Sequence, residues 1–191
     1  LASASATRSL PRDLSSGDNT VQSARILAVS LDEAETNLLL HGLPSLYDAE
    51  VSDALLTAVL SALVPWVGMR RLRIDLEHHG RHELAPGLDL SRTVGWFTSV
   101  FPVYLELPVA ASGAGGAGEA IKSIKEQLRQ IPNRGIGYGI LRYLGGASAL
   151  SERAEPQISF NYMGQFDQIG QIGQIHEEGL ILGPAEESCG P

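Results

Sequence analysis

The feature that most constrains the fold is a change in the spacing of apolar residues along the chain. Between Asp48 and Val67 they recur at intervals of three and four, which is typical of an amphipathic helix packed on a sheet: Val51, Leu55, Ala58, Val59, Ala62 and Leu63. From Arg71 to Glu77 the apolar residues instead alternate with polar ones, the pattern of a strand. A helix followed directly by a strand favours an α/β fold.

Other segments repeat these two patterns. Further strands are predicted at residues 23–31, 98–107, 157–163 and 180–182, and further helices at residues 32–42, 119–131 and 138–144. Asp32 and Glu35 form a capping-box pattern, and Pro65 is expected to end or bend its helix. The glycine-rich residues 110–118 are predicted to form a loop. The order of elements predicts an α/β class with a mixed sheet and helices packed against it.

The chain has 191 residues, a length that suits one domain or one large lobe. Residues 1–20 are predicted to be an entry linker, residues 21–183 the folded lobe and residues 184–191 a tail. Because the sequence begins with Leu1 instead of Met, we expect it to be a piece of a longer protein.

Charge and cysteine content narrow the possible partners and compartments. The formal net charge is -8 and the basic residues are scattered, which argues against binding to nucleic acid or to an anionic membrane surface. The sequence contains no apolar run of transmembrane or signal-peptide length. Cys189 is the only cysteine, so an internal disulfide is excluded and a reducing, cytoplasmic setting is expected.

Polar, glycine-flanked groups interrupt the strand-like runs, and such violations of pattern mark candidate sites. Glu77 at the end of the strand over residues 71–77 is predicted to be a general acid or base, with His79 and Arg81 fixing the loop around it. A metal set of His78, His79, His82 and Glu83 is less favoured, because Gly80 and the preceding strand indicate a loop. A solvated loop with incidental histidines is the third interpretation.

The remaining motifs are of unequal value. Asn161 and Tyr162 lie in a strand-like run, where a buried amide would require partners and could polarise a carbonyl group. Trp96 and Phe97 are expected to be buried aromatic side chains. The glycines at 135, 137 and 139 are spaced as GxGxG and follow a helix, so they predict a tight turn and no dinucleotide site. Neither Ser99 nor Ser159 lies in a GxSxG motif, so catalysis by a serine nucleophile is not expected.

Five phrases, in order, carry a resemblance: DALLTAVLSAL from Asp53, LEHHGRHE from Leu76, SRTVGWFTSVFPVYLEL from Ser91, IPNRGIGYG from Ile131 and SFNYMGQFD from Ser159. With them the chain resembles, from about Pro11 to Asp167, the C-terminal half of an epimerization domain of a nonribosomal peptide synthetase, in the condensation-domain superfamily. The resemblance implies one lobe of a chloramphenicol-acetyltransferase-like (CoA-dependent acyltransferase) fold, whose two lobes form a V with the active site between them.

The resemblance also implies an activity and roles for residues. Such a domain inverts the α-carbon of an aminoacyl or peptidyl thioester from L to D. Glu77 matches the family's catalytic glutamate in EGHGRE, although His78 replaces a glycine and His82 a glutamate. Arg81 would hold the loop, and Asn161 and Tyr162 would line the tunnel near the thioester. Trp96 and Thr98 would shape the tunnel floor.

The partners implied are a peptidyl carrier protein, which presents the substrate on its 4'-phosphopantetheine arm, and a first lobe with an HHxxxDG motif that the sequence lacks. No directly bound cofactor or metal is expected, and the isolated lobe is expected to be inactive. Two alternatives stay open: the C-terminal lobe of a peptide-bond-forming condensation domain, and a non-catalytic module that docks a carrier protein.

Overall fold

The computed structural model describes residues 10–12, 14, 16–17, 20–81, 87, 89–90, 92–109, 116–145, 150 and 157–164. Contacts divide the chain into two units. The first consists of residues 1–13 and 30–162, and the second of residues 14–29 and 163–191. The sheet and its helices all belong to the first unit.

The first helices of this unit follow one another without a break. They are α1 (Glu33–Asn37), the π-helical η2 (Leu38–Gly42) and α2 (Leu43–Tyr47). The predicted capping box is confirmed, because Asp32 Oδ1 accepts from Glu35 N at 2.8 Å and Asp32 N donates to Glu35 Oε2 at 3.0 Å. The predicted end at Gly42 is wrong, since Gly42 keeps a helical φ of -71°. The chain turns only at Asp48, which has a φ of 49°.

The helix that forms the core is α3 (Val51–Val67), as the spacing predicts, but the predicted packed face is wrong. Leu56 and Leu60 face the core, whereas Ala58 and Ala62 of the predicted face are exposed. The Glu50 N–H donates to Asp53 Oδ2 at 2.8 Å at its start. Pro65 does not stop the helix at once, because the helix continues through Val67. The helix ends at Gly68, whose φ of 71° suits glycine.

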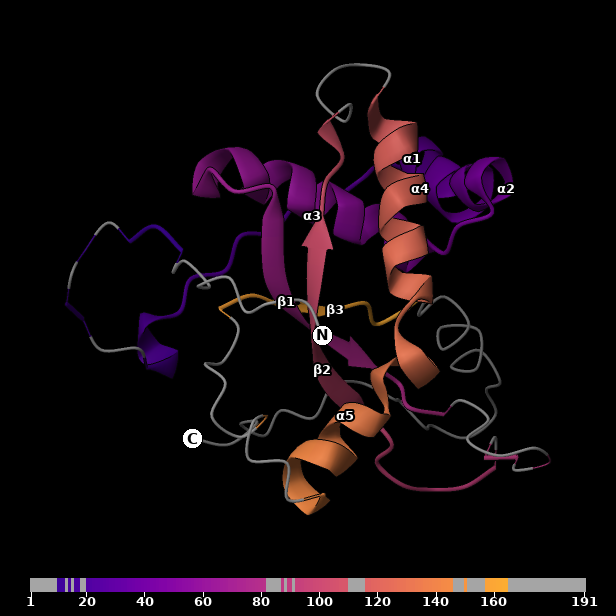
Figure 1. Ribbon diagram of the computed structural model, residues 1–191. Helices are drawn as coiled ribbons and strands as arrows, with labels where there is room; N and C mark the ends of the chain where they lie inside the picture. The colour runs from indigo at the N-terminus through magenta and orange to yellow at the C-terminus, as the bar shows by residue number, and fades with distance from the viewer. Residues whose placement is uncertain are drawn as a thin grey trace, which may run out of the picture. The chain divides into compact units, whose positions relative to one another are not determined.

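The sheet has three strands in the order β2-β1-β3, and Figure 1 shows them crossing the centre of the first unit. They are β1 (Arg71–His78), β2 (Ser99–Glu106) and β3 (Ser159–Asn161). The central strand β1 pairs antiparallel with β2 and parallel with β3, which confirms the predicted mixed sheet. The third strand is shorter than the predicted residues 157–163.

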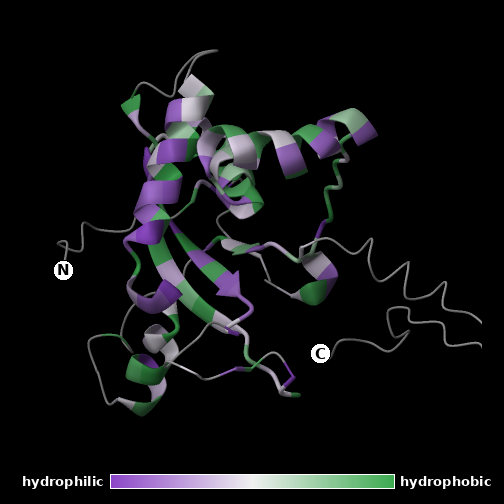
Figure 2. Ribbon diagram, turned by 90° about the vertical axis from the view of Figure 1, so that its right-hand side faces the viewer, coloured by the Kyte–Doolittle hydropathy of each residue, from purple (hydrophilic) through white to green (hydrophobic). Residues whose placement is uncertain are grey.

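Helices cover one face of this sheet. The face is formed by every second residue of β1 and β2, and these side chains join α3 and α4 (Gly116–Arg129) in one buried cluster. In Figure 2 the apolar and polar residues alternate along the strands of this sheet. The main members of the cluster are Leu56, Leu60, Leu72, Ile74, Leu76, Phe101, Val103, Leu105, Ala120 and Ile124. Each large side chain in this core stabilises the fold by about 1.5–3 kcal/mol through burial.

A tight left-handed turn follows α4, within the 3-10 segment Pro132–Gly135. In Figure 1 this segment lies between the labelled helices α4 and α5. Asn133, Arg134 and Gly135 have consecutive positive φ values of 48°, 50° and 80°. A Cβ atom at Gly135 would lie 2.3 Å from the Phe101 ring, so only glycine fits there. The turn leads into α5 (Gly137–Gly139) and the π-helical η5 (Ile140–Leu144), as the glycine spacing predicts.

In the second unit, the predicted strand over residues 23–31 is wrong. The structure has a 3-10 turn at Val21–Ser23, in which Ser23 Oγ donates to the Thr20 carbonyl at 2.7 Å, and irregular chain thereafter. Ile26 is 96% exposed, because no described strand pairs with this segment. The predicted strand at residues 180–182 lies outside the described residues.

Within the part of the chain that the structure describes, no single helix has the length and apolarity needed to cross a membrane. The segments Glu33–Tyr47 and Val51–Val67 reach that length only as a pair, and the pair is bent by 101°.

Candidate functional site

The sheet register places Glu77 between two specific neighbours. Glu77 is opposite Val100 on β2 and opposite Asn161 on β3. Side chains of residues directly opposite each other lie on the same face of a sheet, so these three form a row across the strands. The predicted catalytic residues Glu77 and Asn161 are therefore adjacent in space, about 4.8 Å apart along the hydrogen-bonding direction.

This row lies on the face opposite the helix-covered core. Alternation along the strands assigns to it a mixed set of side chains: Arg71, Arg73, Asp75 and Glu77 from β1; Val100, Pro102, Tyr104 and Glu106 from β2; Ser159 and Asn161 from β3. The Arg71 guanidinium lies 5.0 Å from the centre of the Tyr104 ring. Arg73 is buried and Glu77 is half-buried. This face thus carries ionisable side chains along β1, with Glu77 near the C-terminal end of the strand.

Asn161 and Tyr162 differ from the expectation of a buried pair. Asn161 is exposed, because β3 is an edge strand of the described sheet, and its amide is accessible beside Glu77. Tyr162 follows the last paired residue and is half-buried. The structure brings the Asn161 position next to Glu77, and Tyr162 follows it directly in the chain.

His78 points away from Glu77. Successive residues of a strand face opposite sides, so His78 lies on the core side, where its ring centre is 4.9 Å from that of His79. Burial lowers the pKa of His78, and His79 and Arg134 lower it further while Glu50 opposes them. Among the residues described, no three histidine, cysteine or carboxylate side chains group as metal ligands; His82 and Glu83 lie outside that part.

Arg81 holds the loop that leads into β2. Its Nη1 donates to the carbonyl of Leu90 at 2.9 Å and that of Thr93 at 2.8 Å, and its Nη2 donates to the carbonyl of Gly95 at 3.1 Å. The guanidinium also lies 4.4 Å from the centre of the Phe97 ring. One planar cation thus closes residues 90–97 around itself, as the fork of donors in arginine allows.

The turn between Glu77 and Arg81 is built around Gly80 and His79. Gly80 is buried with a φ of 65°, and a Cβ atom there would lie only 1.6 Å from the Phe97 carbonyl oxygen. His79 is exposed and its Nδ1 accepts from the Arg81 N–H at 3.1 Å. The loop that follows Glu77 is therefore fixed by a close backbone approach that only glycine permits.

The expectation that Trp96 is buried is wrong. Trp96 is 89% exposed. Its two neighbours in the sequence both contact Arg81, Gly95 through its carbonyl and Phe97 through its ring. Phe97 and Thr98 are half-buried, and Thr98 immediately precedes β2. The loop therefore presents the Trp96 indole to the outside.

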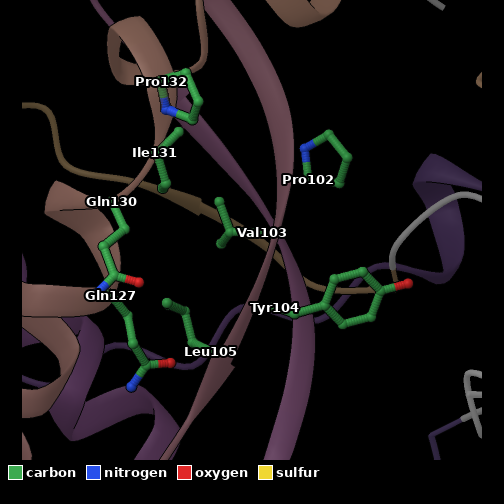
Figure 3. Close-up of a pocket in the computed structure, with 8 residues that line it drawn as sticks. All are labelled: Pro102, Val103, Tyr104, Leu105, Gln127, Gln130, Ile131 and Pro132. Carbon is green, nitrogen blue, oxygen red and sulfur yellow. The ribbon is translucent and has the colours of Figure 1, made fainter. Parts of the chain in front are cut away.

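A groove of about 470 Å³ lies elsewhere, along the outer edge of β2 (Figure 3). Figure 3 shows Val103 and Leu105 turned toward α4, and Tyr104 turned the other way. At its end Gln127 Oε1 accepts from the Glu106 N–H at 2.9 Å, and Gln127 Nε2 donates to the Glu106 carbonyl at 2.8 Å. None of the candidate catalytic residues lines this groove, so it is separate from the Glu77 row.

Two positions of this site were missed from the sequence. Val100 becomes a neighbour of Glu77 only through the register of β1 with β2, which no local pattern indicates. Gly80 by itself indicates only a loop, and its contact with Phe97 depends on how residues 92–97 fold. The isolated glycine between a strand and a charged residue was the available signal for a close backbone approach.

Known proteins are similar to this chain in sequence. The family model described as Condensation domain matches residues 1–186. Chondramide synthase cmdD from Chondromyces crocatus is 43% identical over 182 residues, which are 95% of this chain and 4% of that protein. Bacitracin synthase 3 from Bacillus licheniformis is 42% identical over 165 residues, 86% of this chain and 2% of that protein. The chain thus spans only a small fraction of these relatives.

One solved structure is similar in both fold and sequence. It is the crystal structure of the epimerization domain from the third module of tyrocidine synthetase B, with a TM-score of 0.75 and 38% identity. The match covers 86% of this chain and 36% of that one.

Proposed function

The chain belongs to the condensation-domain family, and from that premise we propose that it is the C-terminal lobe of an epimerization domain. The complete domain would invert the α-carbon, from L to D, of an aminoacyl or peptidyl group. That group would be carried as a thioester on the 4'-phosphopantetheine arm of a carrier protein during nonribosomal peptide synthesis. The 38% identity to a solved epimerization domain supports this proposal.

Inversion at this carbon is a proton-transfer reaction. The α C–H bond breaks, its electron pair delocalises onto the thioester carbonyl, and a proton returns from the opposite side of the planar intermediate. The site therefore needs an acid/base group near each side of that plane and a donor near the carbonyl oxygen. Positioning these groups before the reaction supplies much of the rate enhancement.

Glu77 is proposed as the acid/base group of this lobe. Its carboxylate is half-buried at the end of the central strand, on the face that the described helices leave open. Gly80 and Arg81 fix the chain just after it, so the carboxylate is held on a rigid element. A rigid support of this kind is what proton transfer over hydrogen-bond distance requires.

Asn161 and Tyr162 are proposed as the groups that stabilise the developing oxyanion. The Asn161 amide is exposed in the row next to Glu77, where it could donate to a carbonyl oxygen while Glu77 takes the α-proton. Arg81 and His79 are proposed as positioning residues, and Trp96 and Thr98 as residues that shape the floor of the site. The register contact between Glu77 and Asn161 is the single observation that carries the proposal.

The second acid/base group would come from a first lobe with the HHxxxDG motif, which this chain does not contain. The chain alone is therefore proposed to be inactive, and its partners are that lobe and the carrier protein. No directly bound cofactor or metal is required for the proton transfers described.

The test is a Glu77→Gln variant in the two-lobed domain that contains this chain. With a loaded carrier in D₂O, the wild-type domain is expected to exchange and invert the α-proton, and the variant to lose both activities by about 10²-fold or more. Glu106→Gln is the matched control, because it lies on the same face about 20 Å along the sheet and should retain activity. An unchanged rate in Glu77→Gln would remove its catalytic assignment.

The same assay separates the alternatives. A peptide-bond-forming condensation domain would form an amide bond between the groups on two loaded carriers, releasing the thiol of one carrier, without exchange of the α-proton. A non-catalytic docking module would bind the carrier and do neither.

A further inference from the structure

The two neighbours of Glu77 in the row differ sharply in chemistry. Asn161 on the β3 side offers an amide, whereas Val100 on the β2 side offers only branched hydrocarbon. Val100 is 48% exposed, so its side chain remains accessible to a bound molecule. The carboxylate therefore has one polar flank and one apolar flank.

The hydrogen-bond pattern shows that Val100 is held close to Glu77. The Leu107 N–H donates to the Arg70 carbonyl at 3.1 Å, which makes that pair a hydrogen-bonded one. Such pairs alternate in an antiparallel ladder, so Glu77 and Val100 fall on a non-hydrogen-bonded pair. Pairs of this kind have Cα atoms only about 4.5 Å apart and the closer side-chain contact. Consistently, the Asp75 N–H points to β3, where it donates to the Ile158 carbonyl at 2.9 Å.

This asymmetry orients a substrate whose α-carbon lies over Glu77. Three substituents then lie in the plane of the intermediate: the thioester carbonyl, the nitrogen and the side chain. With the carbonyl group toward the Asn161 amide, the other two substituents both lie on the β2 side, and one of them is nearer to Val100. The nitrogen needs a hydrogen-bonding partner that Val100 lacks, so the apolar flank suits the side chain better.

We propose that Val100 is a specificity-determining residue, which contacts the side chain of the amino acid being inverted and limits its size next to the α-carbon. This inference rests on the function proposed above and deepens it. The substrates favoured are those whose side chain is apolar at the β-carbon, because that atom would lie against the valine methyl groups.

The test uses the two-lobed domain with its carrier loaded in turn with alanyl, valyl and phenylalanyl groups, and measures α-proton exchange in D₂O. Val100→Ala is expected to raise the rate for valyl relative to alanyl groups by about tenfold, since one or two methyl groups in an apolar pocket discriminate on this scale. Val100→Ile should shift the same ratio in the opposite direction. Val109→Ala is the matched control, because Val109 is 80% exposed beyond the end of β2.

The outcomes separate this inference from the function on which it rests. Opposite shifts of the ratio in Val100→Ala and Val100→Ile, with no shift in Val109→Ala, support it. An active wild-type domain whose ratio is the same in both Val100 variants overturns the role of Val100 alone. A wild-type domain that exchanges no α-proton overturns the proposed function and this inference together.

Discussion

Glu77 and Asn161 are direct register partners on the parallel strands β1 and β3, although they lie in distant parts of the sequence. Their side chains emerge on the same face, and that face is the one the described helices do not cover. An acidic group and a hydrogen-bond donor are thus placed side by side by the backbone itself. Strand pairing therefore sets the spacing of the two groups.

Removal of the Asn161 amide should slow the reaction without unfolding the sheet. Asn161→Ala is expected to lower the α-proton exchange rate of the two-lobed domain by about 10²-fold, as loss of one oxyanion donor does elsewhere. Because Asn161 is exposed at a sheet edge, the thermal unfolding midpoint of the variant should differ little from that of the wild-type domain. Ser159→Ala is the control on the same strand and face, and an equal loss there would indicate a general effect on β3.

Gly80→Ala should destabilise the lobe strongly. A methyl group there combines a φ of 65° with a backbone oxygen 1.6 Å away, so strain and overpacking together are expected to cost about 3 kcal/mol. Gly68→Ala isolates the first effect, since Gly68 has a φ of 71° and nothing within 4 Å of the added atom. Urea unfolding of both variants measures the difference, and equal costs would contradict the close contact with Phe97.

Arg81→Lys should loosen residues 90–97. A lysine has no planar fork and so cannot bond the carbonyls of Leu90, Thr93 and Gly95 together while stacking on Phe97. Hydrogen exchange in this segment is expected to accelerate, and the fluorescence anisotropy of the exposed Trp96 to fall. Arg92→Lys, at an exposed position in the same loop, should leave exchange unchanged.

Asp48→Asn should change how stability depends on acid. Asp48 accepts from Lys125 at 2.9 Å and from Arg129 at 3.2 Å, and Lys125 foremost lowers its pKa below the ordinary value of 3.8. The unfolded chain then binds the proton more readily, so this contribution is present above pH 3.8 and is lost as the pH falls through the folded pKa.

Asn tolerates the left-handed φ of 49° at this position, so Asp48→Asn removes the charge alone. Thermal midpoints of both proteins between pH 2 and pH 6 should converge at the acid end, according to linkage. A constant difference over that range would mean that the ion pairs add nothing.

The sequence was sufficient to predict a helix or a strand wherever the spacing of apolar residues determines the type of element. Alternation at Leu72, Ile74 and Leu76 predicted β1, and the three-to-four spacing before it predicted α3. For β1 the alternation also gave the buried side, whereas for α3 the spacing gave the helix and not its buried side, which carries Leu56 and Leu60. Together the patterns led to the mixed α/β class that the structure confirms. The resemblance to the condensation superfamily is likewise confirmed by the family match and by the solved epimerization domain.

Prediction failed where distant residues decide the outcome. Ile26 and Val29 have strand propensity, yet no described strand pairs with them. Trp96 was expected inside because aromatic side chains usually are, but the contacts of Arg81 across the loop leave it outside. The pairing of Glu77 with Val100 likewise required the register between two strands that residues 79–98 separate in the sequence.

The side-chain amide of Gln127 meets both polar groups of Glu106, and so takes the place of one residue of a neighbouring strand. Pro102 lies on the same outer edge of β2, two residues before Tyr104, and has no backbone N–H to donate. A strand of another polypeptide would therefore find few free hydrogen-bonding groups along this edge of β2. This arrangement disfavours the edge-to-edge pairing of strands that leads to fibrils. Replacement of Gln127 would open such a route without touching Glu77.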